Sequence, residues 1–224
     1  YYLAGTGAPA GSSRRNVAAA VTDGTLIAPN RGGGFLYSNT GYTMLAEVVR
    51  RVSGTPLAAF ADEHIFSPLG MRHTRFRDDV TNVMPGRAGA YDAGGAKALD
   101  AGVAEEPIGP GGVYTTLEDW ALWEQNARAN RLGADLEQIV KRITGPDGEG
   151  DAGTHYHCGV RRTWVGDVRM QGHLGGYLSY SAYWLRAEAV SILVMANGPG
   201  VYAIAVGSEL AADLMPAATR AGYR

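Results

Sequence analysis

Two short polar segments, far apart in the chain, contain the side chains best suited to chemistry. The first is Tyr37-Ser38-Asn39 and the second is Gly172-His173-Leu174-Gly175-Gly176. A phenol, an amide and an imidazole can donate, accept or relay protons, and glycines let another chain approach the backbone closely. Neither segment is specific alone, because Ser and Asn are also common helix N-caps and a histidine among glycines also occurs in turns.

A helix is predicted to hold the first segment. Beyond Asn39, apolar residues recur on one helical face, with Glu47, Arg50 and Arg51 on the other face. Ser53-Gly54 is predicted to end the helix, because glycine readily adopts the left-handed conformation. The apolar positions are Met44, Leu45, Val48, Val49 and Val52. We therefore expect the Tyr-Ser-Asn triplet at the N-terminus of a helix packed on a core, where backbone N–H groups favour anions or polarised carbonyls.

Composition excludes several classes of function. The 224 residues suffice for one large domain or two small ones, and the formal net charge is −2. This charge gives no support for binding nucleic acid or an anionic membrane surface. Cys158 is the single cysteine, so the chain has no internal disulfide. No apolar run reaches membrane-spanning length, and the cellular compartment stays open.

The first 150 residues carry mainly helical signals. After Thr55-Pro56, a typical helix start, a second helix is predicted with Pro68 and Gly70 ending it. Its inward positions are predicted to be Leu57, Phe60, Ala61, His64 and Ile65. The cluster Gly109-Pro110-Gly111-Gly112 lacks the Gly-Lys-Ser/Thr ending of a phosphate loop. We interpret it as a structural turn.

A third helix is predicted after Thr116, a good N-cap followed by Asp119 at the capping position. Its inward stripe is predicted to comprise Leu117, Trp120, Ala121, Glu124 and Ala127. Another helix is expected over residues 134–143, and the Gly- and Pro-rich residues 145–150 are the best internal boundary.

Beyond that boundary the pattern changes to strands. Strands are predicted within 155–165, 168–171, 177–185 and 190–196, and a last helix after residue 200. The inward positions of that helix are predicted to be Val201, Ile204, Ala205, Ser208, Ala211 and Ala212. The order of elements predicts an α+β fold. A mostly helical region, 1–150, would carry Tyr37 and Asn39. A three- or four-stranded antiparallel sheet with a C-terminal helix, 151–224, would carry His173. We expect a cleft between the two regions.

The run His155-Tyr156-His157-Cys158 invites comparison with a metal site. On a strand, His155 and His157 would share a face while Cys158 points to the other. No third ligand is evident beside them. We therefore expect neither a metal nor another cofactor.

Three blocks of sequence resemble the serine β-lactamase and penicillin-binding-protein-like hydrolases, a family that includes class C β-lactamases, D-alanyl-D-alanine carboxypeptidases, D-aminopeptidases and esterases. The blocks are FLYSNTGYTMLAEVVRRVSGTPLAAFADEHIFSPLGM at 35–71, GPGGVYTTLEDWALW at 109–123 and GHLGGYLSYSAYW at 172–184. The resemblance implies a β-lactamase/transpeptidase-like fold and an acyl-enzyme mechanism.

That family has three catalytic motifs: Ser-x-x-Lys, Tyr-x-Asn and Lys/His-x-Gly. Tyr37 and Asn39 match the second motif, and His173 and Gly175 match the third. No serine of this chain has a lysine three residues later. The resemblance therefore implies that the chain is the C-terminal portion of such a hydrolase and that the nucleophile belongs to a segment upstream of residue 1.

The resemblance also implies roles for the matching residues. Tyr37 would act as base or acid, since a nearby cation favours an ionised phenol, and Asn39 would bind the motif lysine and the substrate amide. His173 would orient Tyr37 and a polar group of the substrate. Gly175 would let the substrate lie along the strand. The backbone N–H of Gly176 would stabilise the oxyanion.

The motifs leave the substrate open among D-peptides, β-lactams, esters and D-amino-acid amides. Leu174 stands where many relatives carry Thr or Ser, which argues against specific β-lactamase activity. A second hypothesis is a non-catalytic remnant that acts as a ligand-binding or scaffold domain. Because the family's N-terminal strands complete the same sheet, we expect an open sheet edge here. A missing N-terminal segment or a second copy would cover it.

Overall fold

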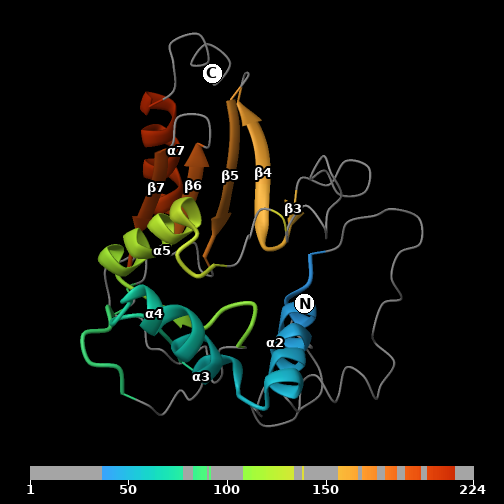
Figure 1. The fold of residues 1–224 in the computed structure, drawn as a ribbon. Coiled ribbons are helices and arrows are strands. Elements are labelled where there is room, and N and C mark those ends of the chain that lie inside the picture. Colours follow the sequence, from blue (N-terminus) through green and yellow to red (C-terminus); the bar gives the residue numbers. More distant parts are fainter. Residues whose placement is uncertain are drawn as a thin grey trace, which may run out of the picture. The chain divides into compact units, whose positions relative to one another are not determined.

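The computed structural model describes residues 37–77, 83–89, 91, 108–133, 138, 156–165, 168–175, 180–185, 190–197 and 201–214. The chain forms two compact units (Figure 1), one of Tyr1–Pro85 with Ala101–Leu136 and one of Gly86–Asp100 with Glu137–Arg224. The described part of the first unit is mainly helical, and that of the second is an antiparallel sheet with a helix. The α+β class is therefore as predicted. The expected boundary at 145–150 and most of the expected helix at 134–143 lie outside the described residues.

Helix α2 (Asn39–Ser53) has both predicted ends. The Ser38 hydroxyl oxygen caps it by accepting a hydrogen bond from the N–H of Gly41 at 3.1 Å. At the other end Gly54 has φ 77° and donates its N–H to the carbonyl of Arg50. The predicted burial of the apolar face is not observed, because Leu45, Val48 and Val52 are all exposed.

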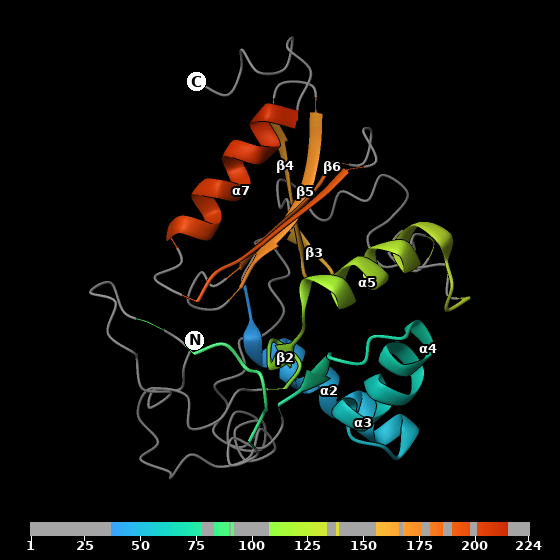
Figure 2. The same ribbon diagram turned by 90° about the vertical axis from the view of Figure 1, so that its left-hand side faces the viewer.

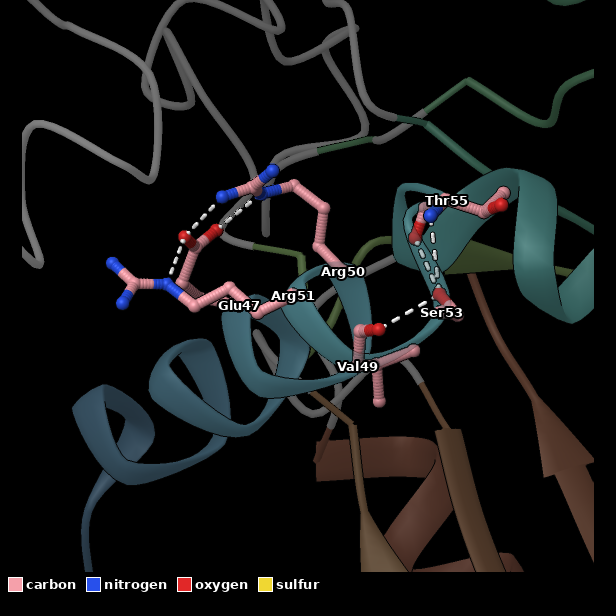
Figure 3. Close-up of polar contacts among 6 residues, drawn as sticks. All are labelled: Glu47, Val49, Arg50, Arg51, Ser53 and Thr55. Atoms are coloured by element: carbon pink, nitrogen blue, oxygen red, sulfur yellow. Dashed lines mark hydrogen bonds and ion pairs between the residues drawn. The ribbon is translucent and has the colours of Figure 1, made fainter.

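A polar turn connects α2 to the next helical segment (Figure 3). The Ser53 hydroxyl donates to the carbonyl of Val49 at 2.7 Å and accepts from the N–H of Thr55 at 3.1 Å. These short-range bonds fix the direction in which the chain leaves α2, and α3 packs against α2.

That next segment is helical from Leu57 to Leu69 but changes its winding in the middle. It comprises α3 (Leu57–Ala61), the π-helical turn η1 (Asp62–Phe66) and α4 (Ser67–Leu69), and Gly70 ends it with φ 79°. The sequence predicted that both Pro68 and Gly70 end this helix. Gly70 does, but Pro68 does not. It lies in α4, after a wide π turn whose backbone bonds span five residues, as in Ser67 N–H to Asp62 carbonyl.

The hydrophobic core of this unit is built around the helical segment from Leu57 to Leu69. Its buried members are Ala61, Phe66, Leu69 and Met71, and the half-buried residues packed on them are Ile65, Phe76, Leu122, Trp123 and Leu132. The exposed position of His64 contradicts its predicted inward placement. A π turn adds a residue to the helical repeat, so the inward face moves onto Phe66 and Leu69.

Helix α5 (Leu117–Ala129) is attached to the rest of the unit by buried polar residues. Thr116 caps it, accepting from the N–H of Asp119 at 3.2 Å, as predicted. The Asp119 carboxylate is 4% exposed and accepts from the N–H of His73 at 2.7 Å and the hydroxyl of Thr74 at 2.8 Å. Asn126 is also buried, and its side-chain oxygen accepts from the N–H of Leu132 at 3.0 Å.

The predicted apolar stripe of α5 is therefore wrong in its phase. Leu117, Ala121 and Ala127 are exposed, and the inward face runs through Asp119 and Asn126 instead. Hydropathy assigns polar residues to the surface, whereas here hydrogen bonds satisfy them in the interior.

The second unit contains a five-stranded antiparallel sheet whose strands follow chain order, β3-β4-β5-β6-β7. The strands are β3 (Tyr156–His157), β4 (Val160–Val165), β5 (Val168–Leu174), β6 (Tyr180–Leu185) and β7 (Val190–Met195). The sequence predicted three or four strands, because it assigned 155–165 to one strand. That run is instead a hairpin: Cys158 and Gly159 have φ 48° and 78°, the pattern of a type I′ turn.

Helix α7 (Val201–Leu214) packs against β6 and β7, along one face of the sheet (Figure 2). Where the burial of its side chains is described, the buried positions are small residues, Ala203, Gly207 and Ala211, which allow the helix to approach the strands closely. Ala205 was predicted to face inward but is exposed. Among the described residues, no helix is both long and apolar enough to cross a lipid bilayer.

Candidate active site

The Tyr-x-Asn motif lies at the N-terminus of α2, as the sequence predicted. Tyr37 precedes the cap residue Ser38 and is 46% exposed, while Asn39 is the first residue of the helix and is also exposed. The backbone carbonyl of Asn39 accepts a hydrogen bond from the hydroxyl of buried Thr43 at 3.2 Å. The backbone of the motif is thus held in place, while its two functional side chains remain accessible.

The predicted turn 109–112 lies directly against α2. Gly109 has φ 118°, and a Cβ atom there would overlap the backbone carbonyl of Tyr42 and come within 3.2 Å of the Cβ of Ala46. After the turn, β2 (Val113–Tyr114) pairs with β1 (Arg75–Phe76). The turn therefore supports the first half of α2 from one side, and glycine is the residue that permits this contact.

The charged residues of α2 pair with one another within the helix (Figure 3). Glu47 accepts two hydrogen bonds from Arg50, at 2.7 and 2.6 Å, and one from Arg51 at 3.0 Å. Hydrogen bonds from both guanidinium groups lower the pKa of Glu47 from its usual 4.5 to about 2. Both arginines donate to this carboxylate from positions three and four residues further on, so the cluster stabilises the helix.

The His-x-Gly motif lies at the C-terminal end of β5. His173 is half-buried and opposes Ala182 of β6, and Gly175 follows the end of the strand. The hydroxyl of Tyr156 lies 2.7 Å from Nε2 of His173. The two rings meet edge to face, with centroids 5.6 Å apart and an interplanar angle of 65°. The imidazole is therefore held from a second strand, β3.

The structure thus shows the predicted site residues as two local pairs. Tyr37 and Asn39 belong to the first compact unit, and His173 and Gly175 belong to the second. Gly176 lies outside the described residues. Tyr156 was not among the predicted site residues. Cys158-Gly159 is not one of the residue pairs typical of a tight hairpin turn, so the sequence carries no clear signal for the hairpin that brings Tyr156 near His173.

The run 155–158 does not have the geometry that the metal comparison assumed. Cys158 lies in the turn between β3 and β4 and not on a strand. Within the described ranges, no three His, Cys, Asp or Glu side chains are grouped in a way that could hold a metal ion.

Known proteins resemble this chain over most of its length. The sequence model of the family described as Beta-lactamase matches residues 6–211. The D-aminopeptidase of Cereibacter sphaeroides strain KD131 is 29% identical over 189 residues, which are 82% of this chain and 36% of that protein. The chain therefore spans about a third of the length of this curated relative.

Solved structures show the same fold. The octameric penicillin-binding protein homologue from Pyrococcus abyssi aligns with a TM-score of 0.71 and 21% identity, covering 92% of this chain and 48% of that one. The penicillin-binding protein from Bacillus halodurans aligns with a TM-score of 0.64 and 20% identity, covering 80% of this chain and 57% of that one. Because the family match extends over residues 6–211 and both structures share the fold, this chain belongs to the Beta-lactamase family of serine β-lactamases and penicillin-binding-protein-like hydrolases.

Proposed function

We propose that this chain supplies the Tyr-x-Asn and His-x-Gly motifs of a serine hydrolase that cleaves an amide or ester through an acyl-enzyme. The observation that carries the proposal is the placement of Tyr37 and Asn39, both exposed at the capped N-terminus of α2, in a chain that matches the family over residues 6–211. Exposure at a fixed helix end gives these groups access to a substrate.

The nucleophile in this proposal comes from a Ser-x-x-Lys element outside the 224 residues, which contain no such motif. Its serine hydroxyl attacks the substrate carbonyl, and the serine proton passes through the lysine and Tyr37 to the leaving amine or alkoxide. Backbone N–H groups, including that of Gly176, stabilise the tetrahedral oxyanion. Water then hydrolyses the acyl-serine and regenerates the hydroxyl.

We assign the substrate to amides or peptides of D-amino acids in preference to β-lactams. Support comes from the D-aminopeptidase relative and from Leu174, which lacks the hydroxyl that many relatives place in the third motif. A leucine offers no hydrogen bond to a carboxylate of the substrate at that position.

Exposed apolar side chains support the proposal that the described elements are part of a larger protein. On α7, Val206, Leu210 and Leu214 recur every four residues and are 43–51% exposed. Strand β7 is at an edge of the described sheet. Edges and apolar stripes of this kind are normally covered. We assign the cover to the part of the hydrolase that carries Ser-x-x-Lys.

A non-catalytic ligand-binding or scaffold role remains the alternative. One observation favours it, the absence of a Ser-x-x-Lys motif from the 224 residues.

The proposal is tested by substituting Tyr37→Phe in the purified intact polypeptide and measuring hydrolysis of D-alanine p-nitroanilide. Losing a general acid–base group should lower kcat at least about 100-fold. Tyr91→Phe is the matched control, because Tyr91 is 42% exposed and the chemical change is identical. It should retain activity within about twofold. Equal rates for the two variants would contradict the role of Tyr37, and no hydrolysis by wild type would favour the scaffold alternative.

A further inference from the structure

A tyrosine outside the three family motifs contacts the histidine of the third motif. The hydroxyl of Tyr156, on β3, lies 2.7 Å from Nε2 of His173, on β5. This separation is that of a good hydrogen bond. Both side chains are half-buried, which excludes part of the water that would otherwise compete for the same bond.

The contact crosses a whole strand of the sheet. Tyr156 opposes Arg161 of β4, and Arg161 opposes Gly172, the residue before His173. Because directly opposed residues share a face of a sheet, the register alone aligns Tyr156 with Gly172 and not with His173. The long tyrosine side chain, at the start of the two-residue strand β3, reaches the imidazole past β4, where neighbouring strands lie about 4.8 Å apart.

The chemistry of the two groups favours one direction for the bond. A phenol O–H is a good donor, and the unprotonated nitrogen of a neutral imidazole is a good acceptor. With the Tyr156 O–H donating to Nε2, the proton of the neutral ring must reside on Nδ1. The neutral side chain of free histidine in water instead carries its proton mainly on Nε2.

We propose that Tyr156 is a positioning residue for His173. It fixes the orientation of the imidazole and holds the neutral ring as the Nδ1–H tautomer, so that Nδ1 carries the proton that the ring can donate. The catalytic consequence rests on the proposed hydrolase function, whereas the tautomer is a property of the folded sheet and is measured without any substrate. A partner that fixes which ring nitrogen carries the proton is a common device at histidine sites.

The edge-to-face ring contact offers a purely structural alternative, in which Tyr156 only packs against His173. The substitution Tyr156→Phe distinguishes the packing role from the positioning role, because phenylalanine keeps the ring and removes the hydroxyl. Packing alone predicts no change in the tautomer, while positioning predicts a large one.

The test is long-range 1H–15N correlation NMR of the imidazole nitrogens, at a pH where the histidines are neutral. Wild-type His173 should show a protonated Nδ1 and an unprotonated Nε2, and Tyr156→Phe should convert it to a majority of the Nε2–H form. His64, which is exposed on η1, is the internal control and should not change. A wild-type His173 that is mainly Nε2–H would overturn the proposal without any variant, as would an unchanged tautomer in Tyr156→Phe.

A kinetic readout then tests the catalytic consequence. In the intact polypeptide, Tyr156→Phe should lower kcat about tenfold with KM within about twofold, while Tyr91→Phe leaves both unchanged. A tautomer change with unaltered kcat would overturn the positioning of His173 for catalysis. If wild type hydrolyses nothing, the hydrolase function fails, and the NMR result still decides whether Tyr156 sets the tautomer.

Discussion

Glu47 accepts hydrogen bonds from two arginines, and this pairing predicts a measurable pH effect on stability. A folded-state pKa of about 2, below the usual 4.5, means that the unfolded chain binds more protons between these values. The stabilising contribution is therefore complete above pH 4.5 and is lost as pH falls toward 2. Surface exposure and salt reduce its size.

The prediction concerns the pH dependence of the free energy of unfolding, measured by urea titration at constant ionic strength. Glu47→Gln should be less stable than wild type at neutral pH, and the difference should shrink below pH 4.5 and vanish near pH 2. Glu63→Gln, which removes an exposed carboxylate from η1, controls for net charge. A stability difference for Glu47→Gln that does not change with pH would contradict the pairing.

Asp119 is the buried carboxylate that joins α5 to the end of the preceding helical segment. It accepts from the N–H of His73 and the hydroxyl of Thr74, which also contacts the hydroxyl of Thr115 at 2.7 Å. Asp119→Ala removes the acceptor of the His73 N–H and one partner of the Thr74 hydroxyl, and it should cost about 2–4 kcal/mol of unfolding free energy.

Glu118→Ala is the control for Asp119→Ala. Glu118 shares the first turn of α5, so it experiences the same helix dipole, but it is exposed. It should cost less than about 1 kcal/mol in the same denaturation experiment. Equal costs for the two substitutions would show that the buried network contributes nothing.

At the scale of elements, the positions of caps and turns were predictable, whereas the inward faces of helices were less so. Ser38, Gly54 and Thr116 end or begin helices as predicted, because capping depends on local chemistry. The π turn in the second helix shifted the inward face by about one residue, and hydropathy gives no signal for such a turn. In α5 the buried polar residues reversed the expected stripe.

The turn 109–112 carries the sharpest prediction at this scale. Gly109→Ala would place a methyl group against the carbonyl of Tyr42 at a positive φ, so we expect a loss of about 3 kcal/mol or more. Gly111→Ala is a matched control in the same turn, because no atom lies within 4 Å of its added Cβ. Its unfolding free energy should change by less than about 1 kcal/mol. Similar denaturation midpoints for the two variants would contradict the packing of the turn on α2.

At the scale of the whole chain, the α+β class and the family followed from the order of elements and from the three sequence blocks. The number of strands did not, because a two-residue strand such as β3 is too short to show alternation. Tyr156 was missed for the same reason: it lies on this two-residue strand, and its side chain contacts His173 from across β4. The catalytic roles of Tyr37, Asn39, His173, Gly175 and Gly176 remain predictions.

The most direct test of the proposed function is to locate the covalent label left by a fluorophosphonate on the intact polypeptide. The polypeptide is purified, its intact mass is compared with the 23.6 kDa of these 224 residues, and the labelled peptide is identified by mass spectrometry. We predict a larger mass and a label on the serine of a Ser-x-x-Lys peptide outside this sequence, reduced in Tyr37→Phe. A mass of 23.6 kDa, or a label on a serine within these 224 residues, would contradict the account.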